Sequence, residues 1–588
     1  MKETSLISSN SAKIQSNEMD LTFPALCPGA RYYEDANKKV IILGSPIYNG
    51  KIDCYGVIEK LKDEPIENFI TDVNGSFLFF LYEKEAARLT AVNDRFASIP
   101  FYYRDCNGIF AGSTSYSEIW KKHRNTAGFK IDEGAFYEFL FLRRLFGDKT
   151  YDCDTKFLDS ASILIHSPDS KKTTVTRYWQ PDCVIHNMPF PEAAERLAFL
   201  IQQSFKRVTS DAKRYGLLLS GGLDSRSVLA ASDKPLVCLT TCEYENNEYL
   251  VARELANVRG YEHIFVPKPK TYYSDIIDSA TDLGSGMGIY ANAHFFNMRD
   301  AAAKTADVLL HGYGFDFLFG GKYLPCTAHP LLKGITYKRR LLPIEPNTQD
   351  AARMFIETLS YRLKSIDPRT LIKVKQRTGM VDALQKRTED IFDEAREISD
   401  NPYAWWDYSL FRNMSRHYSY LNLLSIRTYL EERTVAFDND LYDFFWSLSP
   451  EQRLNGVLFK EAIRSLDPEI FRVRLANTNL SLGDPDIVAS GKILLNQIFK
   501  VTRLNRIFKR SIPPPRAKER SWSIDADTIR DNLKLKERTQ RLCASSNLER
   551  LRFLDIDAVS ACVKEHIEGR KDHTYLILSL ITLDKFLE

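Results

Sequence analysis

The feature that most constrains the fold is the stretch LLLSGGLDSRSVLA, residues 217–230. An apolar run ends at Ser220, two glycines follow, and an amphipathic segment begins near Asp224. A strand that gives way to a helix in this manner presents backbone N–H groups at the positive end of a helix dipole, where phosphate binds well. The alternative is a plain strand–turn–helix joint in which Asp224 and the serines only cap the helix.

The side chains of this stretch predict a phosphate held together with a divalent cation. Gly221 and Gly222 have no Cβ, so the backbone there can approach a ligand closely. Ser220 and Ser225 add hydroxyl groups. Asp224 would repel a bare phosphate, and its presence therefore implies Mg²⁺ between the carboxylate and the phosphate oxygens.

The pattern of apolar residues divides the chain into an arm and two domains. Residues 38–179 carry short β-prone runs broken by Gly, Asn and Asp, which predict an antiparallel first domain. From residue 192 onward, short apolar strands alternate with helical patterns, as in a parallel sheet covered on both faces. We therefore expect an α/β protein with a flexible arm over residues 1–20, a first domain over 21–184 and a second over 185–588, its last part helical.

Composition excludes several classes of function. The net charge of the 588 residues is only +3, and the chain shows no basic stripe of the kind that nucleic-acid-binding proteins carry. No apolar run approaches the ~18 residues of a membrane span, and the N-terminal residues lack a signal-peptide core. Ten cysteines without a CxxC pair indicate thiols of a reducing compartment. The sequence thus predicts a cytoplasmic protein that binds no nucleic acid and spans no membrane.

Taken as a block, SGGLDS resembles the phosphate loop of the PP-loop ATP pyrophosphatases, and in particular the synthetase domain of the asparagine synthetase family. Further motifs follow the family in the same order. NGSFLFFLYEKEAARLTAVNDRFASIPFYY (residues 74–103) and RYW (177–179) resemble the family's glutaminase domain. The matches to its synthetase domain are NNEYLVARELANVRGYEHIFV (246–266), HGYGFDFLFGGKY (311–323) and YLEERTVAFDNDLYDFFWSLSPEQRLNG (429–456).

The resemblance implies a fold, cofactors and a reaction. The first domain would be an Ntn-hydrolase-like antiparallel sandwich, and the second an adenine nucleotide α-hydrolase-like domain with a parallel sheet. Members of the family bind ATP with Mg²⁺ so that pyrophosphate sits in the loop, and they form an acyl-adenylate on a substrate carboxylate. By position, Asp224 and Asp316 would hold the metal ion. The ATP site would comprise Leu219, Ser220, Gly221, Gly222, Asp224, Ser225, Thr240, His311 and Gly312.

The first domain departs from the glutaminase pattern. The family's glutaminase needs a cysteine directly after the initiator Met, where this chain has Lys2, and lysine cannot replace that nucleophile. Cys27 lies in ALCPGA, which does not match the family. The family's NGE turn, which supplies an oxyanion donor, is Gly44-Ser45-Pro46 here. We therefore predict a degenerate, inactive glutaminase domain that keeps a structural or docking role.

The second domain departs from the pattern in the loop that contains Asp316, residues 311–317, which we call the metal loop. Asparagine synthetases read SGEGxDE there, whereas this chain reads HGYGFDF, with Tyr313 in place of the glutamate. In this respect the chain resembles β-lactam synthetase and lasso-peptide cyclase-like members. In the former, a Tyr working with a carboxylate deprotonates an amine within the substrate, which makes the amine nucleophilic. Glu431 and Asp407 are the candidate carboxylates, and the alternative is that Tyr313 is an aromatic wall of the pocket.

A third departure concerns the charge that stabilises the intermediate. The family follows its Leu-Pro-x-x-Ile segment with Arg-x-Lys, and the corresponding piece here is SLDPEIFRVRLANTNLSLG. Arg474 matches the arginine, but the lysine position falls on Ala476. Three explanations stay open: Arg472 or Arg474 replaces the lysine, the alignment is shifted, or the second half-reaction is altered or lost.

Together these patterns predict an ATP-dependent carbon–nitrogen ligase without glutaminase activity of its own. It would activate the carboxylate of a small molecule or peptide as an acyl-adenylate and transfer it to ammonia or an amine. The catalytic residues would be Tyr313, Glu431 and Arg474. A precursor peptide or a pathway protein would be the macromolecular partner. The alternatives are a divergent asparagine synthetase and a nucleotide-binding scaffold without turnover.

Overall fold

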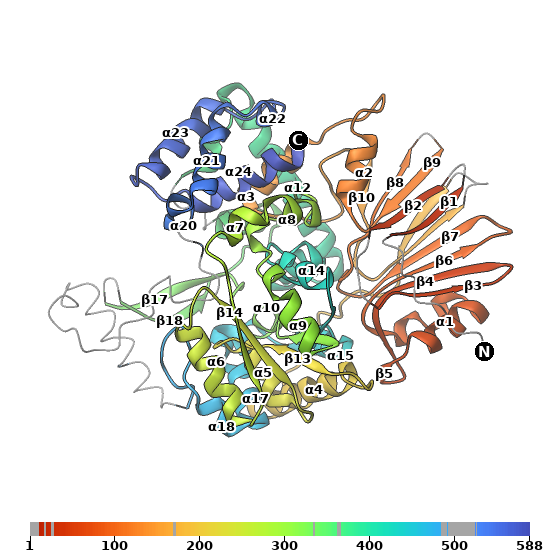
Figure 1. Ribbon diagram of the computed structural model, residues 1–588, viewed down its shortest axis with the longest axis vertical. Coiled ribbons are helices and arrows are strands. Elements are labelled where there is room, and N and C mark those ends of the chain that lie inside the picture. The colour runs from red at the N-terminus through yellow and green to blue at the C-terminus, as the bar shows by residue number, and fades with distance from the viewer. Residues whose placement is uncertain are drawn as a thin grey trace.

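The computed structural model describes residues 11–16, 19–24, 29–106, 108–167, 172–332, 335–360, 366–483, 491, 524 and 526–588. A sheet-rich unit lies at one side of the molecule, a parallel-sheet unit lies beside it, and a group of helices completes the molecule (Figure 1). Lys2 and Cys27, on which the sequence argument about the glutaminase rested, lie outside the described residues.

Two sheets build the first unit. The larger is antiparallel throughout, in the order β12-β11-β7-β6-β4-β3, with β5 paired to β4. The smaller has the order β1-β2-β9-β8-β10 and contains one parallel pair, β2 with β9. The strands are β1 (Ser11–Ser16), β2 (Met19–Pro24), β3 (Arg31–Glu34), β4 (Lys38–Tyr48), β5 (Lys51–Ile52), β6 (Asn74–Glu83), β7 (Arg88–Asn93), β8 (Tyr102–Cys106), β9 (Ile109–Ser113), β10 (Thr155–Phe157), β11 (Ser162–Ser167) and β12 (Lys172–Arg177).

The arm that was expected over residues 1–20 is in part a strand pair. Ser11–Ser16 forms β1 and pairs antiparallel with β2, which begins at Met19. This strand pair could not be predicted from the sequence, because β1 is polar and β2, on which it lies, joins the sheet through β9, about ninety residues further along the chain. The other residues of that range lie outside the described part of the chain.

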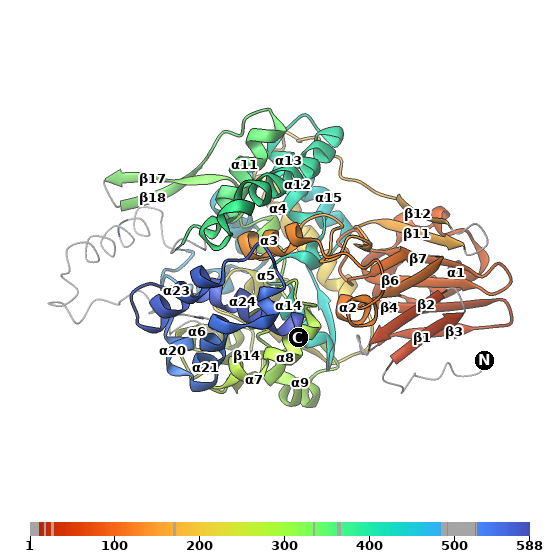
Figure 2. The same cartoon turned by 90° about the horizontal axis from the view of Figure 1, so that it is seen from above.

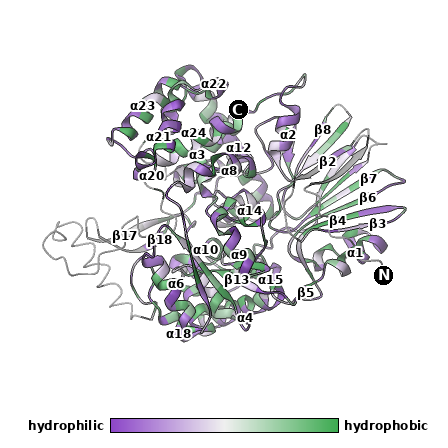
Figure 3. Cartoon of the chain, viewed as in Figure 1, coloured by the Kyte–Doolittle hydropathy of each residue, from purple (hydrophilic) through white to green (hydrophobic). Residues whose placement is uncertain are grey.

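Alternation along the strands gives the first unit two apolar layers. Leu78 and Phe80 of β6 face the core between the two sheets, whereas Phe77 and Phe79 face the core beneath α1 (Cys54–Asp63). Successive strand residues point to opposite faces, so one strand serves both layers. The outer ends of β3 and β4 are hydrophilic (Figure 3). Helices α2 (Tyr116–His123) and α3 (Glu133–Leu142) follow the sheets.

The second unit contains a parallel sheet in the order β15-β14-β13-β16-β19. Every residue of β13 and β16 is buried, as expected for central strands with both faces covered. β14 lies on one side of β13 and β16 on the other, so the strand order reverses at β13, and ligands of open α/β sheets bind outside the carboxyl ends of strands at such a point. These strands are β13 (Tyr215–Leu218), β14 (Val237–Cys242), β15 (His263–Pro267), β16 (Val308–His311) and β19 (Glu431–Thr434).

Helices surround this sheet and build the rest of the molecule. Nearly all of α24 is buried, and α3 of the first unit lies against both α12 and α24 (Figure 2). Among the described residues, no helix is long and apolar enough to cross a membrane. The remaining elements are α4 (Phe190–Val208), α5 (Asp224–Ala231), α6 (Asn247–Val258), α7 (Tyr272–Asp275), α8 (Ile277–Leu283), α9 (Arg299–Thr305), α10 (Phe315–Leu318), β17 (Cys326–Leu332), β18 (Ile335–Leu341), α11 (Thr348–Leu359), α12 (Arg377–Ile398), α13 (Pro402–Phe411), α14 (Leu421–Arg427), α15 (Asn439–Ser447), α16 (Pro450–Arg453), α17 (Val457–Leu466), α18 (Pro468–Arg472), α20 (Ala526–Asp531), α21 (Leu533–Arg541), α22 (Ser546–Glu549), α23 (Ile556–Ile567) and α24 (Thr574–Leu587).

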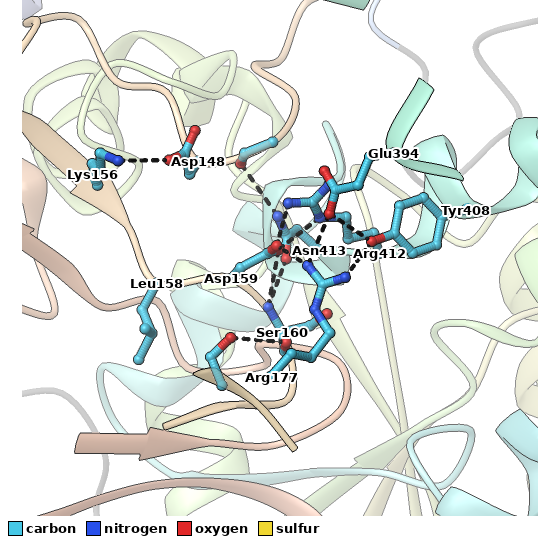
Figure 4. Close-up of polar contacts among 12 residues, drawn as sticks. Asp148, Lys156, Leu158, Asp159, Ser160, Arg177, Glu394, Tyr408, Arg412 and Asn413 are labelled. Atoms are coloured by element: carbon cyan, nitrogen blue, oxygen red, sulfur yellow. Dashed lines mark hydrogen bonds and ion pairs between the residues drawn. The ribbon is translucent and has the colours of Figure 1, made fainter. Parts of the chain in front are cut away.

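A network of charged residues joins the first unit to the helices. Asp159, between β10 and β11, accepts a hydrogen bond from Arg412 at 2.9 Å and another from Arg177 (Figure 4). Glu394 of α12 accepts from the same two guanidinium groups and from the Tyr408 hydroxyl at 3.0 Å. Burial alone would raise the pKa of Asp159, but Arg412 and Arg177 outweigh it and hold the pKa below its usual value. The two units therefore share a paired, partly buried set of charges.

Candidate active site

The loop between β13 and α5 is fixed largely by its own side chains. The Ser220 N–H donates to Ser225 Oγ at 2.9 Å, and the Gly222 N–H donates to Ser220 Oγ at 3.2 Å. The Gly221 N–H donates to Glu248 of α6 at 2.8 Å. The predicted cradle of loop N–H groups is thus partly occupied within the protein, and the groups left for a ligand are those of the first turn of α5, which lack intrahelical partners.

Two glycines of the site are required by close packing. A Cβ on Gly221 would lie 2.3 Å from the Ala476 methyl carbon. A Cβ on Gly312, which follows β16, would lie 2.2 Å from the carbonyl carbon and oxygen of Asp224. The backbone after β16 therefore rests directly on the first turn of α5. This contact brings the metal loop next to the phosphate loop.

A cavity of about 380 Å³ opens at the carboxyl ends of β13, β14 and β16. Its walls combine the loop after β13 with residues of the metal loop and of two helical segments. Most of the sequence-predicted ATP residues line it, whereas Gly221 and Gly222 are not among the described residues of the lining. The lining residues are Leu218, Leu219, Ser220, Asp224, Ser225, Leu239, Thr240, Thr241, Asn292, His294, Phe295, His311, Gly312, Tyr313, Asp316, Phe317, Lys322, Tyr323, Tyr418, Ser419, Asn422, Leu423, Ile524 and Tyr575.

Asp224 and Asp316 both line this cavity, as the sequence predicted. Burial and the nearby carboxylate of Asp316 together raise the pKa of Asp224 to about 8, and Lys322 opposes the shift. Lys322 Nζ lies 2.6 Å from Asp316 Oδ2. The described residues contain no cluster of three or more His, Cys, Asp or Glu side chains that could hold a metal ion unaided. Lys322 balances the charge of Asp316, and a cation bound between the two carboxylates would favour the ionised form of Asp224.

Tyr313 also lines the cavity, but its partner is a histidine. Its hydroxyl lies 3.0 Å from His417 Nδ1 and 3.4 Å from Ser419 Oγ, and His417 Nδ1 lies 2.9 Å from Ser419 Oγ. Tyr313 additionally packs edge-on against Phe317 and Tyr420. The polar partner and the aromatic wall, which the sequence posed as alternatives, are therefore both present.

The expectation that Glu431 or Asp407 is the partner of Tyr313 is wrong. Glu431 stands opposite Val308 in the β16–β19 register, about 10 Å of strand before the carboxyl end at His311. It accepts from Ser45 at 2.7 Å and pairs with Lys213 and with Arg433 at 2.6 Å. Asp407 is buried and accepts from Arg453 at 2.5 Å.

The carboxylate that does reach the carboxyl end of the sheet is Glu432, which the sequence analysis passed over. Glu432 lies 2.5 Å from His311 Nε2 and 2.8 Å from Arg427 Nε, and it is buried. Burial would raise its pKa, but Arg427 and His311 hold the pKa at about 2. Glu432 thus orients His311 beneath the cavity. Strand alternation is the signal that separates Glu431 from Glu432, because the two side chains point to opposite faces of β19.

Arg474 does not reach the cavity, contrary to its predicted catalytic role. Its guanidinium donates to Asn247 at 2.6 Å and to Asn479 at 2.5 Å, and it faces Glu254 at 3.7 Å. Ala476 instead packs on the loop, and its N–H donates to the Gly221 carbonyl at 3.1 Å. Neither Arg472 nor Arg474 is among the described residues that line the cavity.

Thr240 lines the cavity, where the resemblance places it in the ATP site, and its hydroxyl also makes hydrogen bonds that hold neighbouring strands together. Its hydroxyl donates to the Leu219 carbonyl at 2.7 Å and lies 2.9 Å from His263 Nε2. This contact ties the end of β13 to the end of β14. The sequence analysis missed the lining residues Ser419 and Lys322 and also His417, which contacts Tyr313. Of these only Lys322 stands in a motif already quoted, directly after the second glycine of GGKY.

Comparison with known proteins bears on both units. A family model described as asparagine synthase matches residues 196–471, and one described as a glutamine amidotransferase domain matches residues 34–118. The protein named "putative asparagine synthetase 2 (glutamine-hydrolyzing)" of Methanocaldococcus jannaschii is 22% identical over 331 residues, which are 53% of this chain and 63% of that protein. Asparagine synthetase 1 (glutamine-hydrolyzing) of Bacillus subtilis is 22% identical over 261 residues, 43% of this chain and 41% of that protein.

The chain thus covers less than two-thirds of the length of these relatives. Among solved structures, the allosteric regulatory enzyme of purine biosynthesis aligns at 7% identity with a TM-score of 0.18, over 40% of this chain and 62% of that chain. A similarity this low supports no argument. The sequence matches show that the chain contains an asparagine synthase domain and a glutamine amidotransferase domain, and that it is a distant homologue of asparagine synthetases.

Proposed function

We propose that this protein is an ATP-dependent ligase that activates a carboxylate as an acyl-adenylate and transfers the acyl group to ammonia or an amine. The observation that carries the proposal is the convergence of Ser220, Asp224 and Asp316 on one cavity, where the strand order of the parallel sheet reverses. The acyl donor would be a small molecule or a peptide. The asparagine synthase match over residues 196–471 supports this class of reaction.

The donor set fits Mg²⁺. Magnesium is usually held by one or two carboxylates, with phosphate oxygens and waters completing the octahedron. Asp224 and Asp316 supply two carboxylates, and the described residues offer no third acidic, His or Cys ligand beside them. When bound, the metal would neutralise charge on the phosphates. A shared cation would also stabilise the ionised form of both carboxylates, because it removes the mutual repulsion that contributes to the raised pKa of Asp224.

In the first half-reaction a carboxylate oxygen attacks the α-phosphorus of ATP, and pyrophosphate leaves. The first turn of α5 can accept that pyrophosphate, because its N–H groups and the helix dipole favour an anion. In the second half-reaction the amine nitrogen attacks the acyl carbon, and AMP leaves. An amine must lose its proton for this step, so the cavity needs a proton acceptor.

Tyr313 and His417 are the groups placed to take that proton. Burial raises the pKa of Tyr313 well above its usual value, so the phenol keeps its proton and is a poor base alone. Its hydroxyl, however, lies 3.0 Å from His417 Nδ1. In our proposal the phenol passes its proton to His417 as it receives one from the amine. The histidine thereby takes the role that the sequence analysis gave to a carboxylate.

The ammonia or amine would come from outside the chain, because the residues that match the family's glutaminase site here contact Glu431 of the second domain. Ser45 stands where the family has its oxyanion turn but lies within strand β4, and its hydroxyl donates to Glu431 at 2.7 Å. A Cβ on Gly29 would lie 3.1 Å from Glu431 Oε2, which shows how closely the second domain fills this place. Lys213 and Arg433 complete the cluster. These contacts support the proposal that the first domain is a structural support without glutaminase activity.

The test is carboxylate-dependent exchange of labelled pyrophosphate into ATP, run over a panel of acids that includes L-aspartate and short peptides. We expect exchange with at least one acid and its loss in Asp224→Asn, whereas Asp382→Asn, an exposed aspartate on α12, keeps it. Exchange with L-aspartate would identify a divergent asparagine synthetase. Nucleotide binding without exchange for any acid would instead favour a non-catalytic scaffold and would contradict the proposal.

A further inference from the structure

The cavity holds one strong cationic group that neither the sequence motifs nor the comparisons assign. Lys322 is the only lysine or arginine among the described residues that line it. The position where the resembling family carries a lysine is Ala476, which is buried against the phosphate loop. Arg474 is bonded to Asn247 and Asn479, and neither it nor Arg472 is among the described residues that line the cavity.

Two glycines place Lys322 over the metal loop. Gly320 passes so close to Asp316 that a Cβ would lie 2.8 Å from the Asp316 Cα. Gly321 has a φ of +63° and packs on the Arg453 carbonyl, where a Cβ would lie 2.3 Å away. The chain therefore folds back after α10, and Lys322 Nζ reaches Asp316 Oδ2 at 2.6 Å. Only glycine satisfies both contacts and the left-handed turn.

Lys322 is also free to follow a ligand. Its side chain is 58% exposed at the cavity edge, whereas the Asp316 side chain is 17% exposed. Ligand oxygens that share one octahedral Mg²⁺ lie about 3 Å apart. An ammonium already 2.6 Å from Asp316 can therefore reach a phosphate oxygen that shares the cation with this carboxylate.

We propose that Lys322 binds the β- and γ-phosphates of the nucleotide and stabilises the departing pyrophosphate. This inference rests on the proposed nucleotide site. A charge-assisted hydrogen bond to phosphate is among the stronger contacts in proteins. An ammonium at this place adds to the metal charge where negative charge grows as the bond between the α- and β-phosphates breaks.

The test is calorimetric titration with Mg²⁺ and α,β-methylene-ATP, which cannot release pyrophosphate, and separately with AMP. Lys322→Met is expected to weaken binding of the triphosphate analogue about 10- to 100-fold and to leave AMP binding unchanged. Lys322→Arg should restore most of the affinity. Lys375→Met is the matched control, because Lys375 is exposed and does not line the cavity, and this variant should bind both nucleotides as wild type does.

The outcomes separate this inference from the proposed function. If wild type binds the analogue and Lys322→Met and Lys322→Gln bind it equally well, the role of Lys322 is wrong while the nucleotide site stands. Equal weakening for the analogue and for AMP would also overturn the role, because Lys322 would then act on the shape of the site and not on the phosphates. If wild type binds neither nucleotide, the proposed function itself fails, and the inference with it.

Discussion

Gly312→Ala should weaken nucleotide binding on the order of 100-fold, because position 312 is where the metal loop touches the phosphate loop. An alanine Cβ there would lie 2.2 Å from the backbone carbonyl of Asp224 and 2.6 Å from the Ser225 nitrogen, against 3.4 Å for ordinary contact. Both atoms belong to the main chain, so no side-chain rotation relieves the clash. The end of β16 and the start of α5 must separate by roughly 1 Å, and that shift moves Asp224 and Asp316 apart.

The expected size of the effect follows from this displacement. Overpacking of this kind costs about 1–3 kcal/mol of unfolding free energy. A misplacement of ~1 Å in a positioned site costs on the order of 100-fold in function. Urea unfolding and titration with Mg²⁺ and α,β-methylene-ATP measure the two effects separately. Gly379→Ala in α12 is the control, because nothing lies within 4 Å of its added Cβ, and it should be neutral or slightly stabilising. Analogue binding by Gly312→Ala within threefold of wild type would refute the argument.

Three further perturbations test other parts of the structure. The pKa of Asp224 is raised from 3.8 to about 8, so ionisation of this carboxyl lowers the free energy of unfolding as pH rises between these values. In urea titrations, Asp224→Asn should be more stable than wild type above about pH 8 and equally stable below about pH 4. A stability difference independent of pH would contradict the raised pKa. Tyr313→Phe should slow amide formation at least tenfold while leaving pyrophosphate exchange within about twofold of wild type. Equal loss of both activities would show that Tyr313 only forms part of the cavity wall and transfers no proton. Arg412→Leu leaves Asp159 with one guanidinium partner and should cost about 3 kcal/mol of unfolding free energy, whereas an unchanged urea midpoint would show that the network contributes nothing.

The parts of the site that could be predicted from the sequence are those carried by local motifs. SGGLDS placed Ser220, Asp224 and Ser225 at the carboxyl end of a buried strand, and the structure finds them there, lining the cavity with Asp316. Such motifs work because a strand, a turn and a helix start are specified by neighbouring residues. The α/β architecture and the antiparallel character of the larger first sheet followed from apolar periodicity in the same way.

The parts that could not be predicted depend on contacts between distant segments. His417 meets Tyr313 across 104 residues, and no local pattern marks a histidine in that helical stretch. The choice of Glu431 over Glu432 failed because it depends on which face of β19 each side chain takes, and a four-residue strand gives too little alternation to decide. Arg474 matched a motif in sequence, but Asn247 and Asn479 hold it elsewhere.

The tight packing of Ala476 on Gly221 has an evolutionary consequence. The Ala476 methyl group already fills the space behind the phosphate loop, and the Asn247 amide donates to its carbonyl at 2.5 Å. A lysine introduced at this position by a single mutation would have to displace the loop before its ammonium could reach the cavity. Position 476 is therefore closed to a long side chain, because any such replacement passes through a variant in which this loop is displaced.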